Sequence, residues 1–472
     1  MSTCEHGLKR TAPFVSNWQI VAGAVWLACL VVMLGASEFS RTSLLRAGDP
    51  PAPKGSVHTQ VRWLLKELDA DQRARRQQAE RELLALGQAI LPVLPPPELL
   101  PNPAVRIAVA RIRVILERRQ AEQSVQATHI TTSQAVTLRE WLRQVEVQTT
   151  NHIDASAVST SVADSLVSQT PQTPFWQALD AVLLQKSLRY QFAPDSAALR
   201  LVPATTPGSE VAWKVSLDGP FRIAVDSVKT RPVTGNAQQQ RLRTELSVAP
   251  EPRLRALFLK LAAKDFRATG PSGRVFAAAD PGAQFDLPLG EGGRFVRWNL
   301  DFAASSNLSD ADIFPLRIEG QATMQIAAAS EHIRFTDLIG GAGTARRRGG
   351  VTVAVQKIQA QAQKDATQVV SLKVLVAYDT GGPAFESHRT WIFHNEVYLN
   401  HQTGALVLPD GGFETDLQAN GSVGVTYHFQ GLKGSLADYE FVYVAPTLIV
   451  DVPVQIRLDA IRPPVTQKQA SG

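Results

Sequence analysis

Gly219-Pro220-Phe221-Arg222-Ile223-Ala224-Val225 is echoed about 130 residues later by Gly350-Val351-Thr352-Val353-Ala354-Val355. Both copies continue with an alternating apolar segment, at 242–248 in one and at 372–378 in the other. Each copy later closes on a similar run, Ile333-Arg334-Phe335 or Ile456-Arg457-Leu458. Because the order and the offset are preserved, the sequence predicts that one β domain has been duplicated.

Alternating apolar residues between Gly and Pro turns are typical of antiparallel sheets that bury one face. We therefore expect two tandem antiparallel β-sandwich domains, at 211–339 and 351–462, joined by a Gly/Arg linker at 340–350. A tail at 463–472 is expected to be disordered. Helical segments earlier in the chain place the whole protein in the multi-domain α+β class.

The composition argues against a nucleic-acid partner. The chain has 472 residues, 44% of them hydrophobic, which is enough for several cored domains. Its 48 basic and 43 acidic residues give a net charge of only +5. A charge this small, without a long basic cluster, is not typical of a protein that binds DNA or RNA.

An uncharged apolar segment near the N-terminus predicts a transmembrane helix at 18–39, preceded by a cytoplasmic tail at 1–17. A cleaved secretory signal is the competing interpretation, but Leu34-Gly35-Ala36 places leucine where the cleavage site needs a small residue. We expect an uncleaved anchor, and so a single-pass protein whose first partner is the lipid bilayer.

The orientation of this helix rests mainly on the length of the chain that follows it. Basic residues flank both ends, so the positive-inside rule hardly decides. A short N-terminal side and a long C-terminal side favour an inner-membrane protein with periplasmic C-terminal domains. Cysteine usage agrees, since Cys4 and Cys29 are the only two and neither follows the anchor.

A Pro/Gly-rich linker at 40–56 leads into a helical region at 57–123. This region carries the spaced pattern Ala79, Leu83, Leu86-Gly87 and Ile90-Leu91-Pro92, followed by Val105-Arg106. The pattern resembles a single HEAT-type helical repeat, that is, a helical hairpin. One such repeat cannot bury its apolar face alone, so we expect it to pack against a neighbouring domain.

Residues 124–205 predict a βαββαββ module with helices that begin near Thr137 and Thr173. The segments Thr137–Leu142, Phe175–Leu183 and Leu188–Tyr190 resemble the short N-terminal domain of secretins and TonB-dependent receptors. That resemblance implies protein–protein contacts in the periplasm, although no secretin barrel follows. The whole arrangement, with its distinctive stretch at 382–396, resembles uncharacterised membrane-anchored bacterial envelope proteins.

Catalytic motifs do not occur in the sequence, which contains no H-E-x-x-H, G-x-S-x-G, P-loop or paired-cysteine pattern. We therefore expect no cofactor and no enzymatic activity. The weak candidates for a metal site are His394 and Glu396, which would lie roughly 6.6 Å apart on one face of a strand. The matching stretch of the first copy lacks histidine, and a solvated sheet face is the favoured interpretation.

Arg346, Arg347 and Arg348 are the interaction candidates, since glycines on both sides of them make a helix or strand unfavourable. A solvated linker is the simpler interpretation, and contact with an anionic partner is the sharper one. The sequence as a whole predicts an envelope interaction or scaffolding protein that binds other envelope proteins. The alternative is a periplasmic ligand-binding receptor, or a metal-dependent hydrolase, that uses the second β domain.

Overall fold

The computed structural model describes residues 56–192, 199–204, 214–233, 236–289, 294–305, 308–363, 367–378, 392, 395–410, 413–419 and 422–463. The predicted cytoplasmic tail, transmembrane helix and Pro/Gly linker lie outside these residues, except Ser56, as does the C-terminal tail after residue 463. Within the described ranges, no helix combines the length and the apolar character that crossing a membrane requires.

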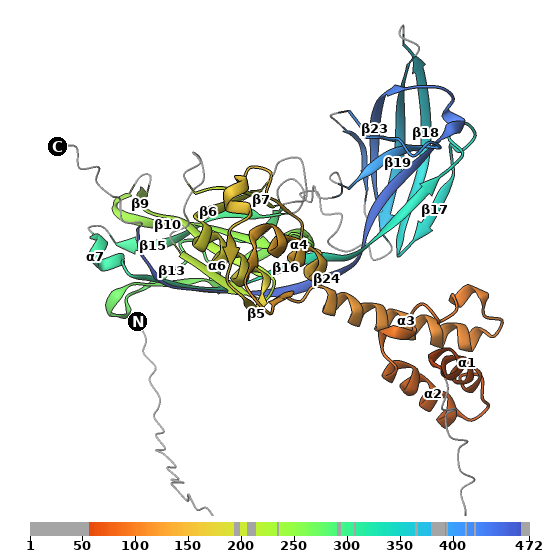
Figure 1. Cartoon of the computed structure of the whole chain (residues 1–472), viewed down its shortest axis with the longest axis horizontal. Helices are drawn as coiled ribbons and strands as arrows, with labels where there is room; N and C mark the ends of the chain where they lie inside the picture. The colour runs from red at the N-terminus through yellow and green to blue at the C-terminus, as the bar shows by residue number, and fades with distance from the viewer. Residues whose placement is uncertain are drawn as a thin grey trace, which may run out of the picture. The chain divides into compact units, whose positions relative to one another are not determined.

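The described chain mixes helices with several antiparallel sheets, as the α+β class requires. Its helical region consists of α1 (Val57–Glu67), α2 (Arg73–Ala85) and α3 (Pro103–Ser124) (Figure 1). Asn102 caps α3 by accepting a hydrogen bond from the Ala104 N–H at 2.8 Å, and proline occupies the first helical position. The apolar faces of the three helices form one core.

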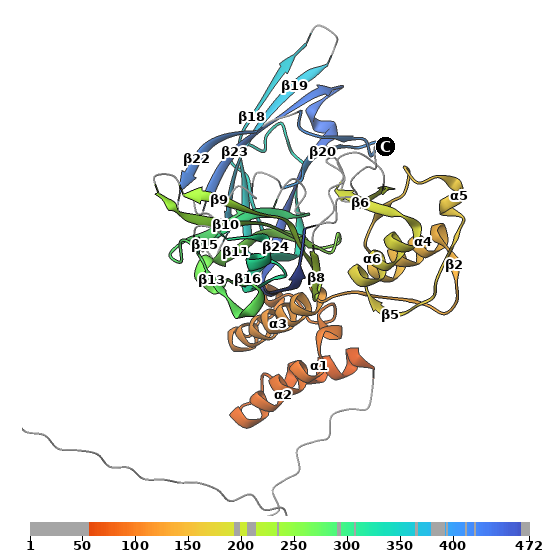
Figure 2. The same cartoon turned by 90° about the vertical axis from the view of Figure 1, so that its left-hand side faces the viewer.

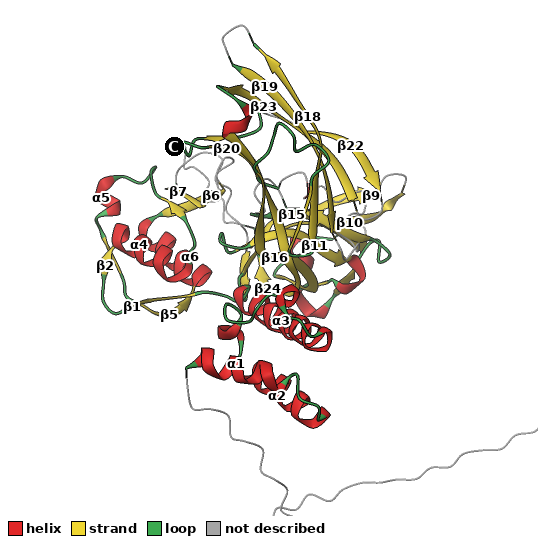
Figure 3. Ribbon diagram, turned by 90° about the vertical axis from the view of Figure 1, so that its right-hand side faces the viewer, coloured by secondary structure: helices red, strands yellow, loops and turns green. Residues whose placement is uncertain are grey.

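The module that follows contains two helices packed beside short strands, as Figure 3 shows. Its larger elements are β1 (His129–Thr132), α4 (Leu138–Thr149), β5 (Thr170–Pro174), α6 (Phe175–Lys186), β6 (Leu188–Phe192) and β7 (Leu199–Pro203). Its small ones are β2 (Val136–Thr137), β3 (Ile153–Asp154), α5 (Thr160–Ala163) and β4 (Leu166–Val167). The strand β4 is short, because the helical turn α5 ends only at Ala163.

We call β8 to β16 the first β unit. Its strands are β8 (Lys214–Asp218), β9 (Phe221–Val233), β10 (Asn236–Pro250), β11 (Arg255–Ala262), β12 (Arg267–Thr269), β13 (Val275–Ala277), β14 (Gln284–Pro288), β15 (Val296–Ser305) and β16 (Leu316–Phe335). Short helical turns lie within it at η3 (Ala263–Asp265), η4 (Pro271–Gly273) and α7 (Asp310–Ile313).

We call β17 to β24 the second β unit. Its strands are β17 (Ala345–Arg348), β18 (Val351–Ala362), β19 (Gln368–Tyr378), β20 (Val397–His401), β21 (Leu406–Val407), β22 (Phe413–Ala419), β23 (Ser422–Leu432) and β24 (Tyr439–Ile461). The helical turn η8 (Leu436–Asp438) lies just before β24.

Strand pairing repeats in the same order in the two units. The first unit contains the order β15-β10-β9-β8, and the second contains β23-β19-β18-β17. In addition β12 pairs with the start of β16, and β20 pairs with the start of β24. Ser309 and Ser435 each form a capping box just before the last strand of their unit. Both units are therefore variants of one plan.

Local irregularities repeat as well. An extra residue interrupts the β9–β10 ladder at Asp226 and the β18–β19 ladder at Gln356, at the same distance from the preceding turn. Those turns have two residues each, and both contain glycine with positive φ, 53° at Gly219 and 53° at Gly349. Shared bulges and turns fix the alignment of the two units residue by residue.

The strands β16 and β24 pair along almost their whole length, from Leu316 opposite Ile461 to Phe335 opposite Phe441 (Figure 2). This pairing exchanges strand halves between the units. Val454, Ile456, Leu458 and Ile461, at the end of β24, lie in the core of the first unit, while Ile333 and Phe335, at the end of β16, lie in that of the second. Where the sequence predicts tandem domains, the structure has one sheet running through both.

Residues 345–348 were expected to lie in the Gly/Arg linker, and the expectation that no strand forms there is wrong. Ala345–Arg348 is β17, which pairs with β18 across a two-residue turn. Both turn residues, Gly349 and Gly350, have positive φ, which is the conformation of a type I′ hairpin turn. The glycines close a hairpin here instead of preventing a strand.

A buried carboxylate joins the helical region, the module and the first β unit. Glu251 is 0% exposed and accepts hydrogen bonds from the N–H and hydroxyl of Thr128, both at 2.8 Å, and from Asn151 at 3.3 Å. Arg253 pairs with it at 2.8 Å and also donates to the carbonyl oxygens of Ser124 and Gln126. These contacts fix where the three parts meet.

Replacing Glu251 with alanine should strongly destabilise this junction. The change leaves the half-buried Thr128 N–H and Arg253 guanidinium without this carboxylate, and such losses cost about 3 kcal/mol. The urea unfolding midpoint should fall, and limited proteolysis should cut near residue 126 sooner. Glu319→Ala is the matched control, because its ion pair with Arg267 is 32% and 65% exposed and is worth about 1 kcal/mol or less. Equal effects of both changes would contradict the role of Glu251.

Candidate functional site

The candidate arginines line a groove between β17 and the C-terminal half of β16, which we call the second seam. Its walls are Ser330–Arg334 and Arg346–Arg348, and it encloses about 680 Å³. The second seam lies where the two sheets of the second β unit come together, because β17 is the last strand of one and β16 continues the other.

Two of the arginines point toward the inner side of this unit. Arg346 is directly opposite Val353 and Arg348 directly opposite Val351, and both valines are fully buried. Directly opposed residues share a face of the sheet, so Arg346 and Arg348 project toward β16. The Arg346 guanidinium carbon lies 5.5 Å from the centre of the Phe335 ring, which places this cation at the mouth of the core.

The backbone of β16 also faces the second seam. Val444 donates its N–H to the carbonyl oxygen of Glu396 at 2.9 Å, so its backbone groups point away from β16. His332 lies directly opposite Val444. In an antiparallel ladder the two residues of such a pair turn their backbone groups outward, and the N–H of His332 therefore points into the second seam.

The charge of the second seam is mainly positive. Arg334 pairs with Glu440, and Glu331 is the acidic residue in the wall. The described residues provide no ion pair for Arg346 or Arg348, whose side chains are exposed. Two positively charged guanidinium groups thus face the edge of β16, and few negative charges lie near them.

In the first β unit the equivalent place, which we call the first seam, is where β8 meets the C-terminal half of β24. There Asp218 accepts a hydrogen bond from the Gln455 N–H at 2.6 Å. The shared turns align Asp218 with Arg348, and the alternation of buried residues aligns Gln455 with His332. One unit closes its seam with a carboxylate, whereas the other has an arginine at the same position.

Of the two metal candidates, His394 lies outside the described residues. Glu396 has an exposed side chain, and its backbone carbonyl oxygen accepts a hydrogen bond from the Val444 N–H. No group of three His, Cys, Asp or Glu side chains that could hold a metal occurs in the described part of the chain. The structure therefore does not test the pairing of these two residues.

A buried contact that the sequence did not reveal lies beside Glu396. Arg255 of β11 donates to Asn395 at 2.6 Å, and Asn395 donates to the Tyr443 hydroxyl at 2.7 Å. Burial lowers the pKa of the Arg255 guanidinium and raises that of the Tyr443 phenol. Because Arg255 belongs to the first unit and Asn395 to the second, the contact joins the two.

A second polar contact lies between the module and the first β unit. Arg222 of β9 pairs with Asp180 of α6 at 3.1 Å and donates to the Tyr190 hydroxyl at 2.9 Å. Burial raises the pKa of the Asp180 carboxyl, although the charge of Arg222 opposes the shift. These residues border a cleft of about 750 Å³, but their charges and hydrogen-bonding groups are already paired with one another. We interpret them as fixing the module in place.

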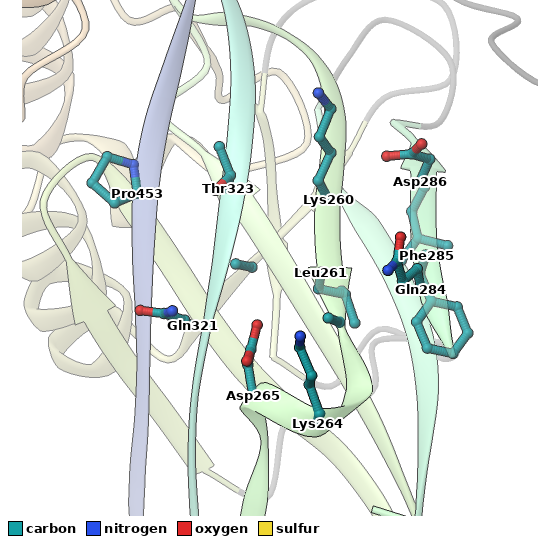
Figure 4. Close-up of a pocket in the computed structure, with 13 residues that line it drawn as sticks. Lys260, Leu261, Lys264, Asp265, Gln284, Phe285, Asp286, Gln321, Thr323 and Pro453 are labelled. Atoms are coloured by element: carbon teal, nitrogen blue, oxygen red, sulfur yellow. The ribbon is translucent and has the colours of Figure 1, made fainter. Parts of the chain in front are cut away.

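Another groove lies on a polar sheet surface of the first unit and encloses about 1070 Å³ (Figure 4). Lys260 of β11 stands directly opposite Asp286 of β14 on one side and Thr323 of β16 on the other. Lys264 and Asp265 follow at the turn after β11 (Figure 4). Basic and acidic residues alternate here, so this groove has no clear preference for a charged ligand.

Compared with known proteins, the chain matches no protein-family model and no curated protein sequence.

Replacing Arg348 with aspartate should close the second seam as Asp218 closes the first. The new carboxylate would accept the His332 N–H, and a hydrogen bond worth about 1 kcal/mol should slow the exchange of that amide about fivefold. Hydrogen exchange followed by NMR or mass spectrometry measures this directly. Arg348→Ser is the control, since it removes the same charge but supplies no carboxylate. Similar exchange rates in both variants would contradict the equivalence of the two seams.

Proposed function

We propose that the protein is a membrane-anchored interaction or scaffolding protein of the bacterial envelope. The observation that supports this best is the contrast between the two seams, because the same strand plan is closed in the first unit and left open and basic in the second. An open strand edge is a feature of surfaces that bind other proteins by strand addition.

The fixed junctions between the parts support the same proposal. Glu251 and Arg253 join the helical region, the module and the first unit, and Arg255 joins the first unit to the second. A scaffold needs such junctions, since a partner bound at one end must be held at a defined position relative to the anchor. The resemblance of residues 124–205 to the secretin-type domain agrees with a role in protein–protein contacts.

The apolar segment at 18–39 supplies the anchor in this proposal, with the later domains in the periplasm. Partners are expected among other envelope proteins, and no enzymatic activity is required. The specific part of the proposal is that the chain is held in the inner membrane while its β units face the periplasm.

Fractionation of bacterial cells tests the anchor. The full chain should stay with the membranes after washing with high salt and with alkaline carbonate, because the burial of an apolar helix is not screened by ions. A variant that lacks residues 18–39 should be released. Recovery of the full chain in the soluble fraction would contradict the proposal.

Protease treatment of spheroplasts tests the orientation. Added protease should digest the β units in spheroplasts, while a cytoplasmic marker protein stays intact as the control for closed membranes. Full protection of the C-terminal half would place the β units in the cytoplasm and would overturn the proposed location.

A further inference from the structure

We propose that the second seam binds an acidic, extended segment of a partner protein, with a carboxylate of that segment at the position that Asp218 occupies in the first unit. This inference rests on the proposed role as an interaction protein and names the chemistry of the partner. It follows from the comparison of two copies of one fold within a single chain.

The first unit shows which group fits such a seam. The carboxylate of Asp218 reaches from β8 to the backbone N–H of Gln455 and joins the two strand edges at 2.6 Å. In the second unit the matching N–H belongs to His332, and Arg348 at the matching position has no acceptor to offer it. A carboxylate supplied from outside would satisfy this N–H in the same way.

The arginines favour such a carboxylate electrostatically. Arg346 and Arg348 project from β17 toward β16, on the side where the backbone of His332 is turned. Guanidinium groups bind carboxylates through paired, charge-assisted hydrogen bonds. An incoming acidic side chain could therefore accept from an arginine on one wall and from a backbone N–H on the other.

The shape of the walls favours an extended segment. On β16 the exposed side chains of Ser330, His332 and Arg334 alternate with the half-buried Glu331 and the buried Ile333, as on a regular strand. An extended peptide laid along this edge would hydrogen-bond to the backbone and direct alternate side chains toward β17.

The same arginines would exclude other segments. Charged side chains that point inward at a strand edge hinder the addition of apolar strands, because their charge would be buried without a partner. A basic segment would be repelled. Because apolar segments would bury unpaired charge and basic segments would be repelled, we expect the second seam to bind segments with acidic residues at alternate positions.

Binding of a labelled peptide to the purified full chain, held in neutral detergent, tests the proposal. The probe is a short fluorescent peptide that alternates Glu with Thr, and the control peptide alternates Gln with Thr. Fluorescence anisotropy should show binding of the acidic peptide that weakens as salt is added, and much weaker binding of the neutral one. Failure of the wild-type chain to bind the acidic peptide would overturn the proposal.

Two variants locate the binding site. Arg346→Ser combined with Arg348→Ser should weaken binding about tenfold or more, because it removes the two arginines that project from β17 toward β16. Arg118→Ser combined with Arg139→Ser changes the net charge equally at exposed sites on α3 and α4, and should alter binding by less than about twofold. Equal losses in the two double variants would show non-specific attraction and would refute a site at the second seam.

Arg348→Asp supplies an independent variant, since its own carboxylate should occupy the second seam and compete with the peptide. Cooperative unfolding in urea, with midpoints no lower than that of the wild-type chain, would show that these variants fold. A further experiment measures the binding of the same proteins to phosphatidylglycerol vesicles and to inorganic phosphate. Loss of vesicle binding in the seam variant, without peptide binding by the wild-type chain, would assign the second seam to lipid phosphate and overturn the proposal. Fractionation results do not depend on this assay, so failure of the anchor and failure of the peptide site are distinguishable.

Discussion

The antiparallel pairing of β16 with β24 is the constraint on which the rest of the structure depends. Ile333 and Phe335 reach the core of one unit only because Val454 and Ile456 reach the core of the other. A shift of one residue in this ladder would turn both sets of apolar side chains out of their cores at once. The cores of both β units therefore fix the register of this ladder, and a change of register in one unit would also disrupt the other.

The shared sheet also explains why the two seams exist. Each long strand contributes its N-terminal half to its own unit and its C-terminal half to the other, where it ends beside a short hairpin strand, β8 or β17. The backbone plan is common, so the difference between the seams depends on side chains. Asp218 and Arg348 occupy equivalent places with opposite charge, and this is sufficient to close one edge and leave the other accessible.

Periodicity and turn residues predicted much of this architecture. The match of Ile333 with Ile456 identified the repeat, and Thr137 identified the start of α4, because both signals are local. The two glycines after Arg348 were misinterpreted as a linker, although a glycine pair between two strands is a hairpin signal. Local patterns cannot reveal the pairing of β16 with β24, since the two strands are far apart in the chain and each reads as an ordinary strand.

The candidate site was predicted only in part, for the same reason. The three arginines were noticed as a charged cluster, but their direction follows from the opposite valines of β18, and the N–H of His332 matters only because of the ladder with β24. Likewise Asn395 has no distinguishing sequence signal, and its role depends on Arg255, which lies 140 residues away.

The exchange of strand halves has a consequence for the order in which the chain can fold. The first unit begins near residue 214, yet its core is completed by four apolar side chains from the end of β24, those of Val454, Ile456, Leu458 and Ile461. While the polypeptide is being synthesised, the apolar face of this unit stays uncovered until β24 has emerged. Contacts of such large sequence separation form slowly, and unfinished sheets aggregate readily. The biogenesis of this protein therefore demands protection of an incomplete first unit, for instance by a holding chaperone, until the last strand arrives.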